Sequence, residues 1–403
     1  PLADHYSYRR SVIMGAIPSG DTFRFYRANL ERRYGETEPE SNIRKWEEVT
    51  LDRQLHWGFT SFGNWVDPAF YPNQKVPYFA YGWIIGDFKV LASKYDIWAP
   101  MPDPFDPEFV LRADVTIKQI ADEIQGSPWC VGVFVDNEKS WGYSKGTIEH
   151  RYGIILDGLS RNAAESPAKA AFTEYLREKY DDIAAVNGAW ETSIDTWDEL
   201  ATGVEFTAHS DALAADLSVM LDMLSNEYFK TVHDALEHYL PNHLYMGVRM
   251  ASWGMPDETV KAAVKYSDVL SFNIYKEGVH PETWGFLKDI DLPAVIGEWH
   301  IGATSDTGLW HPGLLHAPNQ ADRASMWTDY MDSVLAHPNF VGAHWFQYVD
   351  SPLSGRAFDG ENYNVGFVTN TDIPYPEMVE AAQAFNRALY PRRYGEETAQ
   401  GEQ

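Results

Sequence analysis

Carboxylates directly follow two apolar stretches of this 403-residue chain. Residues 131–135 lead into Asp136, Asn137 and Glu138, and residues 294–297 lead into Glu298. Acidic side chains are costly to bury in a core, so a cleft at the strand ends is their natural place. Two carboxyl groups that face each other across a bound sugar can cleave a glycosidic bond, because one attacks the anomeric carbon while the other protonates the leaving oxygen.

The elements that must position these groups alternate between short β-rich runs and helical patterns. Several runs are almost continuously apolar, as expected for strands covered on both faces. Apolar residues recur at helical spacing between them, for example over 117–124 and 221–236. The alternation predicts a parallel sheet, and the chain length favours an α/β fold of the (β/α)8 TIM-barrel type. The seven predicted strands are 58–65, 76–82, 130–135, 244–249, 269–275, 294–298 and 341–346.

An eight-stranded barrel needs one strand more, and we expect the first strand to lie upstream of Pro1. On that count Glu138 ends strand four and Glu298 ends strand seven, on opposite sides of the barrel mouth. Carboxyl groups about 5–5.5 Å apart there would have the geometry of a retaining glycosidase. We predict a catalytic barrel over residues 1–391 with a long insertion after strand four, from 139 to about 216, and a polar tail over 392–403.

The other predicted strand ends carry polar and aromatic residues that suit sugar binding. Tyr275 could donate a hydrogen bond to Glu298, and Asn137 could donate one to a sugar 2-hydroxyl. Two roles fit Arg249: orienting the nucleophile or binding hydroxyls, and a structural ion pair. The predicted substrate-binding residues are Asn64, Trp65, Asp136, Asn137, Arg249, Asn273, Tyr275, His300, Trp345 and Gln347.

Specific roles are predicted for one tryptophan and two histidines. Trp345 offers a flat platform for the sugar at the cleavage point. His300 and His344 could line the site, and a histidine satisfied by backbone groups is the alternative for each.

Composition and motifs exclude several other classes of function. Lys and Arg number 32 against 59 Asp and Glu, a net charge of −27, which argues against nucleic acid and anionic membrane surfaces as partners. We find no run of about 18 apolar residues. The sequence lacks phosphate-binding, dinucleotide-binding, serine-hydrolase and zinc motifs, so no cofactor or metal is implied. Cys130 is the single cysteine. The acidic balance fits a secreted or periplasmic enzyme, and the oligomeric state stays open.

Several stretches resemble glycoside hydrolase family 50, the β-agarases, along nearly the whole chain. The family belongs to clan A, whose barrels carry the acid on strand four and the nucleophile on strand seven. The resemblance implies that Glu138 is the general acid/base and Glu298 the nucleophile. It implies retaining hydrolysis of β-1,4 bonds in agarose to neoagaro-oligosaccharides, mainly neoagarobiose, without a cofactor. The matching stretches are 25–35, 57–65, 76–80, 136–138, 297–300, 344–348, 355–356, 359–362 and 364–366.

Two alternatives remain at this point. The stretch 175–200 is also similar to β-galactosidases of the same clan, so a β-galactosidase-like enzyme is the second candidate. A carbohydrate-binding barrel without catalytic activity is the third, and it differs by retaining agarose without releasing a product.

Overall fold

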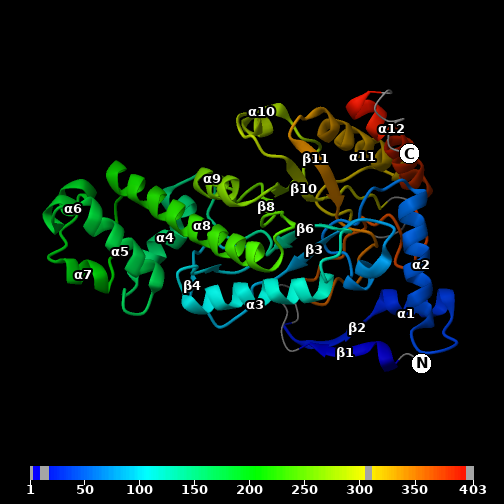
Figure 1. Ribbon diagram of the computed structural model, residues 1–403, viewed down its shortest axis with the longest axis horizontal. Helices are drawn as coiled ribbons and strands as arrows, with labels where there is room; N and C mark the ends of the chain where they lie inside the picture. The colour runs from blue at the N-terminus through cyan, green and yellow to red at the C-terminus, as the bar shows by residue number, and fades with distance from the viewer. Residues whose placement is uncertain (1–2, 10–17, 305–310, 396–403) are drawn as a thin grey trace. The chain divides into compact units, whose positions relative to one another are not determined.

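The computed structural model describes residues 3–9, 18–304 and 311–395 (Figure 1). Its contacts divide the chain into two compact units. We name residues 80–273 the central unit, and residues 1–79 together with 274–403 the terminal unit. Each unit has its own buried core and its own candidate carboxylate.

Short parallel strands form the centre of the central unit. β6 lies between β3 and β7 and pairs in parallel with β7, so that Gly132 is opposite Leu244. β8 pairs in parallel with β9, with Met250 opposite Phe272. A separate antiparallel pair, β4 with β5, forms a hairpin. The bounds are β3 (Tyr78–Gly82, which begins in the terminal unit), β4 (Val90–Leu91), β5 (Met101–Pro102), β6 (Cys130–Val135), β7 (Leu244–Tyr245), β8 (Met250–Ala251) and β9 (Leu270–Asn273).

Amphipathic helices cover these strands, and local sequence signals mark where the helices begin. Asp106 caps α3 by accepting from the Glu108 backbone N–H, with Pro107 as the first helical residue, and Ser210 caps α8. α8 packs against both α3 and α9, while α4 to α7 form one helical cluster (Figure 1). The helices are α3 (Pro107–Ile124), α4 (Ile148–Ser160), α5 (Pro167–Lys179), α6 (Ile183–Trp190), α7 (Trp197–Thr202), α8 (Asp211–Tyr239) and α9 (Asp257–Tyr266).

The terminal unit contains a second parallel pair, β10 with β11. Val295 is opposite Gly342 and Trp299 is opposite Trp345, with irregular register between them. α11 packs against β11 and against α12 (Figure 1). β1 and β2 form an antiparallel hairpin near the N-terminus. The elements are η1 (Ala3–His5), β1 (Tyr6–Arg9), β2 (Gly20–Phe23), α1 (Phe25–Tyr34), α2 (Ser41–His56), η2 (Pro68–Asn73), α10 (Pro281–Trp284), η3 (Gly285–Asp289), β10 (Ala294–Trp299), α11 (Gln320–Ala336), β11 (Phe340–Trp345) and α12 (Pro376–Tyr394).

Six of the seven predicted strands exist, and β6 has the predicted bounds. The predicted strand over 58–65 is wrong, because this segment is irregular. Its backbone donors have other partners: Phe59 N–H bonds the carbonyl of Gln54 in α2, and Phe62 N–H bonds the carbonyl of Pro77. The backbone N–H groups of Phe59 and Phe62 are therefore not available for hydrogen bonds to a neighbouring strand. The four helices α4 to α7 lie within the predicted insertion.

The architecture is mixed α/β, with parallel strand pairs and helices between them. Closure into eight strands stays a prediction, as does the single domain over 1–391. α12 continues through Tyr394, which lies inside the predicted tail over 392–403, and residues 396–403 lie outside the described part of the chain.

A buried carboxylate ties distant parts of the terminal unit together. Asp372 is fully buried and accepts hydrogen bonds from Tyr26 Oη (2.8 Å), Arg53 Nη1 (2.7 Å) and Tyr34 Oη. Arg53 also donates to the Asp372 backbone carbonyl at 3.0 Å. Because α1 and α2 supply these donors, Asp372 fixes both helices to the loop that precedes α12.

We expect Asp372→Asn to lower the free energy of unfolding by about 3–5 kcal/mol, because it leaves the buried Arg53 guanidinium without its carboxylate. Denaturant unfolding followed by fluorescence would measure the loss. As the control, Glu38→Gln breaks the exposed Arg44–Glu38 pair and should cost at most about 1 kcal/mol. Equal losses in the two variants would contradict the prediction.

Candidate active site

The end of β6 turns sharply and presents Glu138. Val133, Phe134 and Val135 are fully buried, and the next three residues leave the strand. Asp136 and Glu138 have φ angles of 60° and 43°, in the left-handed region that costs a non-glycine residue about 1–2 kcal/mol. Such strain persists only where surrounding contacts impose it, and it gathers at functional sites.

Both carboxylate oxygens of Glu138 accept hydrogen bonds within the central unit. The indole N–H of Trp98 donates to Oε2 at 2.7 Å, and Asn273 Nδ2 donates to Oε1 at 2.8 Å. Glu138 is 8 % exposed. The carboxyl group is therefore held in one orientation.

Three predicted residues meet beside Glu138. Arg249 is almost fully buried, and its Nε donates to Asn137 Oδ1 at 2.8 Å. Its Nη2 donates to the Asp136 carbonyl at 2.8 Å, and its guanidinium lies over the Phe134 ring. Asn273 donates to the same Asn137 oxygen at 3.2 Å. Arg249 thus orients the residue next to Glu138 and lies in the central unit, whereas Glu298 lies in the terminal unit.

Asp136 has a different environment from the one that the sequence predicts. The prediction is substrate binding, but this carboxylate is fully buried and accepts from Ile84 N–H (3.0 Å), Tyr228 Oη (2.7 Å) and Lys139 Nζ (3.2 Å). Burial, and then the charge of Asp136, raise the pKa of Tyr228 well above its ordinary value, so the phenol stays a donor. Asp136 therefore anchors the strand end from inside.

Glu298 closes β10 in the terminal unit with a matching pair of donors. Trp65 Nε1 donates to Oε1 at 2.7 Å, and Tyr275 Oη donates to Oε2 at 2.6 Å. The predicted hydrogen bond from Tyr275 is confirmed. Glu298 is 6 % exposed, and Trp65 has a φ of 67°. Each candidate glutamate therefore receives an indole N–H on one oxygen and a second donor on the other.

His300 is fully buried, and both its ring nitrogens meet backbone groups, which is the alternative left open for it. Nδ1 donates to the Phe346 carbonyl at 3.0 Å, and Nε2 accepts from Leu314 N–H at 2.8 Å. Gly313 has a φ of 82°, and a Cβ there would lie 2.5 Å from Nε2, so only glycine allows this approach. Burial lowers the pKa of His300 to about 3, and the ring is neutral.

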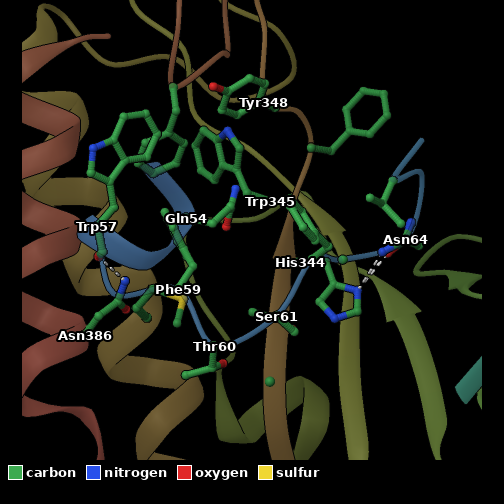
Figure 2. Close-up of a pocket in the computed structure, with 18 of the residues that line it drawn as sticks. Gln54, Trp57, Phe59, Thr60, Ser61, Asn64, His344, Trp345, Tyr348 and Asn386 are labelled. Atoms are coloured by element: carbon green, nitrogen blue, oxygen red, sulfur yellow. Dashed lines mark hydrogen bonds between the residues drawn. The ribbon is translucent and has the colours of Figure 1, made fainter. Parts of the chain in front are cut away.

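A cavity of about 530 Å³ in the terminal unit collects four more of the predicted residues (Figure 2). His344 Nδ1 and Asn64 Oδ1 are hydrogen-bonded at 2.8 Å, as Figure 2 marks with a dashed line. Trp345 Nε1 donates to the Val365 carbonyl, which fixes the indole ring. The predicted residues that line this cavity are Asn64, Trp65, Trp345 and Gln347.

Two residues that bond these carboxyl groups are not predicted from the sequence. Trp98 lies 40 positions before Glu138, and Tyr228 lies 92 positions after Asp136. Neither is part of a motif, so no local signal identifies either one. Within the described residues, no group of three His, Cys, Asp or Glu side chains could hold a metal ion. No helix in this part of the chain has the length and apolarity to cross a membrane.

Known proteins provide a further comparison. No family model matches the chain. The chain is 48% identical over 396 residues to Beta-agarase B of Vibrio sp. (strain JT0107), which covers 98% of this chain and 41% of that protein. A solved exo-beta-agarase superposes with a TM-score of 0.96 at 55% identity, over 98% of this chain and 53% of that one. The structure of PfGH50B gives a TM-score of 0.93 at 52% identity, over 98% and 55%. The chain spans about two fifths of the curated relative's length.

The buried neutral His300 predicts acid sensitivity. The unfolded chain binds a proton at this ring below pH 6.5 and the folded chain does not, so this contribution to stability is present above pH 6.5 and is lost as the pH falls towards 3. Between pH 7 and 4.5 the wild type should lose about 2–3 kcal/mol more than His300→Gln. Denaturant unfolding at both pH values measures this difference. The exposed-site control His238→Gln should keep the wild-type slope, and an equal slope in His300→Gln would contradict the prediction.

Proposed function

We propose that this chain is the catalytic part of a family 50 β-agarase that hydrolyses β-1,4-galactosidic bonds of agarose with retention of configuration. Its products would be neoagaro-oligosaccharides, mainly neoagarobiose. One observation carries the proposal: two strand-end glutamates are each held through both oxygens, in a chain that is similar to agarases over 98% of its length. A (β/α)8 barrel of clan A is part of the same proposal.

Glu298 is the proposed nucleophile. Trp65 and Tyr275 each donate to one of its oxygens, so both oxygens are held as acceptors. Its attack on the anomeric carbon forms a glycosyl–enzyme ester and breaks the bond to the leaving oxygen. The donors also keep one orientation of the carboxylate, which lowers the entropic part of the barrier.

Glu138 is the proposed general acid/base. It gives its proton to the leaving oxygen in the first step. It then takes a proton from the water that attacks the ester in the second step, so the pair returns to its starting state. A retaining mechanism calls for about 5–5.5 Å between the two carboxyl groups, and that distance in a crystal structure would test the pairing directly.

The other predicted residues differ in burial and hydrogen bonding, and their proposed roles differ accordingly. Asn137 is half-buried, and its amide nitrogen is the proposed donor to the sugar 2-hydroxyl. Trp345, Asn64 and Gln347 line a cavity together with Trp65, which bonds Glu298, and we propose that they bind the sugar chain. Asp136, Asn273, Arg249 and His300, which are also predicted to bind substrate, are buried and make hydrogen bonds inside the protein, and we propose that they position the groups that touch the sugar.

The composition is compatible with this substrate. Agarose is a neutral polymer, so a net charge of −27 does not repel it. A secreted or periplasmic location is proposed on the same acidic balance, since excess Asp and Glu help solubility. Nucleic acid is not a proposed partner.

The first test replaces the nucleophile. Glu298→Gln should lower kcat for reducing-sugar release from agarose by at least about 10⁴-fold, because the amide cannot form the ester. The exposed residue Glu282 in the same unit gives the matched control, and Glu282→Gln should keep wild-type kcat. Equal activity of Glu298→Gln and wild type would refute the assignment.

The second test replaces the acid/base. Glu138→Ala should lower kcat on agarose by about 10²–10⁴-fold. Azide needs no general base, so with an activated aryl neoagarobioside it should restore turnover and give a glycosyl azide of retained configuration. Glu174→Gln, an exposed change in the same unit, is the control. An azide product of inverted configuration would contradict the role of Glu138 as acid/base, because azide would then attack the sugar directly in the place of the missing carboxylate.

The substrate is tested in parallel. Cleavage of nitrophenyl β-galactoside without action on agarose would favour the β-galactosidase-like alternative. Retention of the wild-type protein on agarose with no product would favour the binding protein.

A further inference from the structure

Trp98 occupies an exposed hairpin rather than the core. The hairpin is formed by β4 and β5, and Trp98 lies in its loop, half-exposed, beside the exposed Ile97. The loop is fixed at two points. Ala92 N–H donates to Asp157 of α4 at 2.8 Å, and Ile97 N–H donates to Ser140 Oγ at 3.2 Å. Ser140 lies two residues after Glu138, so the loop is tied to the same turn as the glutamate.

Nothing in the packing requires Trp98 to bond Glu138. Trp98 is half-exposed, whereas an indole that is fully buried in a core needs a protein partner for its N–H. The need of a buried N–H group for a hydrogen-bond partner therefore does not explain the 2.7 Å bond to Glu138 Oε2. It joins Trp98 to the one carboxyl group in the central unit to which the proposed function gives a proton-transfer step.

We propose that Trp98 is a positioning residue for general acid–base catalysis by Glu138. The indole N–H only donates, so it holds Oε2 as an acceptor, while Asn273 restricts Oε1 from the other side. Without Trp98 the carboxyl group can rotate about its last bond. Proton transfer to the leaving oxygen then becomes less efficient. The proposal rests on the proposed function, because it needs Glu138 to be the acid.

Trp65 provides a matched comparison within the same chain. It makes the same indole bond, also at 2.7 Å, to the proposed nucleophile Glu298. Loss of the Trp98 bond should affect only steps that need a proton donor. Loss of the Trp65 bond should affect nucleophilic attack whatever the leaving group.

The experiment compares kcat/KM on two synthetic substrates, phenyl and 2,4-dinitrophenyl β-neoagarobioside. Phenolate is a poor leaving group that needs a proton, and dinitrophenolate leaves without one. Trp98→Phe should lower kcat/KM at least about tenfold on the phenyl substrate and less than about threefold on the dinitrophenyl substrate. Trp65→Phe should lower both to a similar extent. Ile97→Ala, a control for disturbance of the loop, should keep the wild-type ratio.

Equal losses on the two substrates in Trp98→Phe, or no loss on either, would overturn the proposal. Glu138→Gln is measured alongside to separate the two levels of inference. If Glu138→Gln loses the phenyl activity and Trp98→Phe does not, only the role of Trp98 fails. If Glu138→Gln loses nothing, the proposed function itself fails.

A measurement that does not depend on turnover tests the proposal if Trp98→Phe does not fold. In protein with ¹⁵N-labelled tryptophan, the Trp98 indole N–H resonance should differ between the wild type and Glu138→Ala, because the alanine variant has no acceptor for this N–H. An unmoved resonance would overturn the proposal. Trp98→Tyr, which keeps a large ring on the loop, replaces Trp98→Phe in the kinetic comparison if needed.

Discussion

A carboxylate leaves water only where protein donors replace its hydration shell, and this constraint organises both units of the chain. Asp136 is the clearest case, because a phenol, an ammonium group and a backbone N–H surround a fully buried carboxylate. That cluster fixes the end of β6 against α8, which carries Tyr228. Glu138 follows two residues later, so its position depends on an anchor that takes no part in the proposed chemistry.

Backbone strain is found at four positions around the two glutamates. Trp65, Asp136, Glu138 and Arg249 all have positive φ, and all four belong to the hydrogen-bond networks of the two glutamates. Each such residue costs about 1–2 kcal/mol, which charge-assisted hydrogen bonds of about 1.5–3 kcal/mol can offset. At these four positions the backbone strain coincides with polar contacts that can offset it.

The two carboxylate centres reach similar geometry through different supports. Around Glu138 the supports are polar side chains, with Arg249 and Asn273 both bonded to Asn137. β10, which carries Glu298, is supported by apolar stacking, with Trp299 lying 3.8 Å from Tyr330 ring to ring. The neutral His300 joins the chain beyond β10 to the Phe346 backbone. In the proposed mechanism, polar support suits Glu138, which exchanges a proton, and rigid apolar support suits Glu298, which must stay aligned.

Local sequence determined which segments become strands and which side chains follow them. Apolar runs define β6 and β10, and with them Glu138 and Glu298, because burial on both faces leaves a pattern that is readable within a few residues. The segment 58–65 looks like a strand by the same pattern, but its backbone donors bond α2 and Pro77 instead. Only the tertiary structure decided the partners of each carboxylate. Trp98 and Tyr228 are 40 and 92 positions away from the groups they bind, and a hydrogen bond depends on proximity in space, which spacing along the chain does not encode.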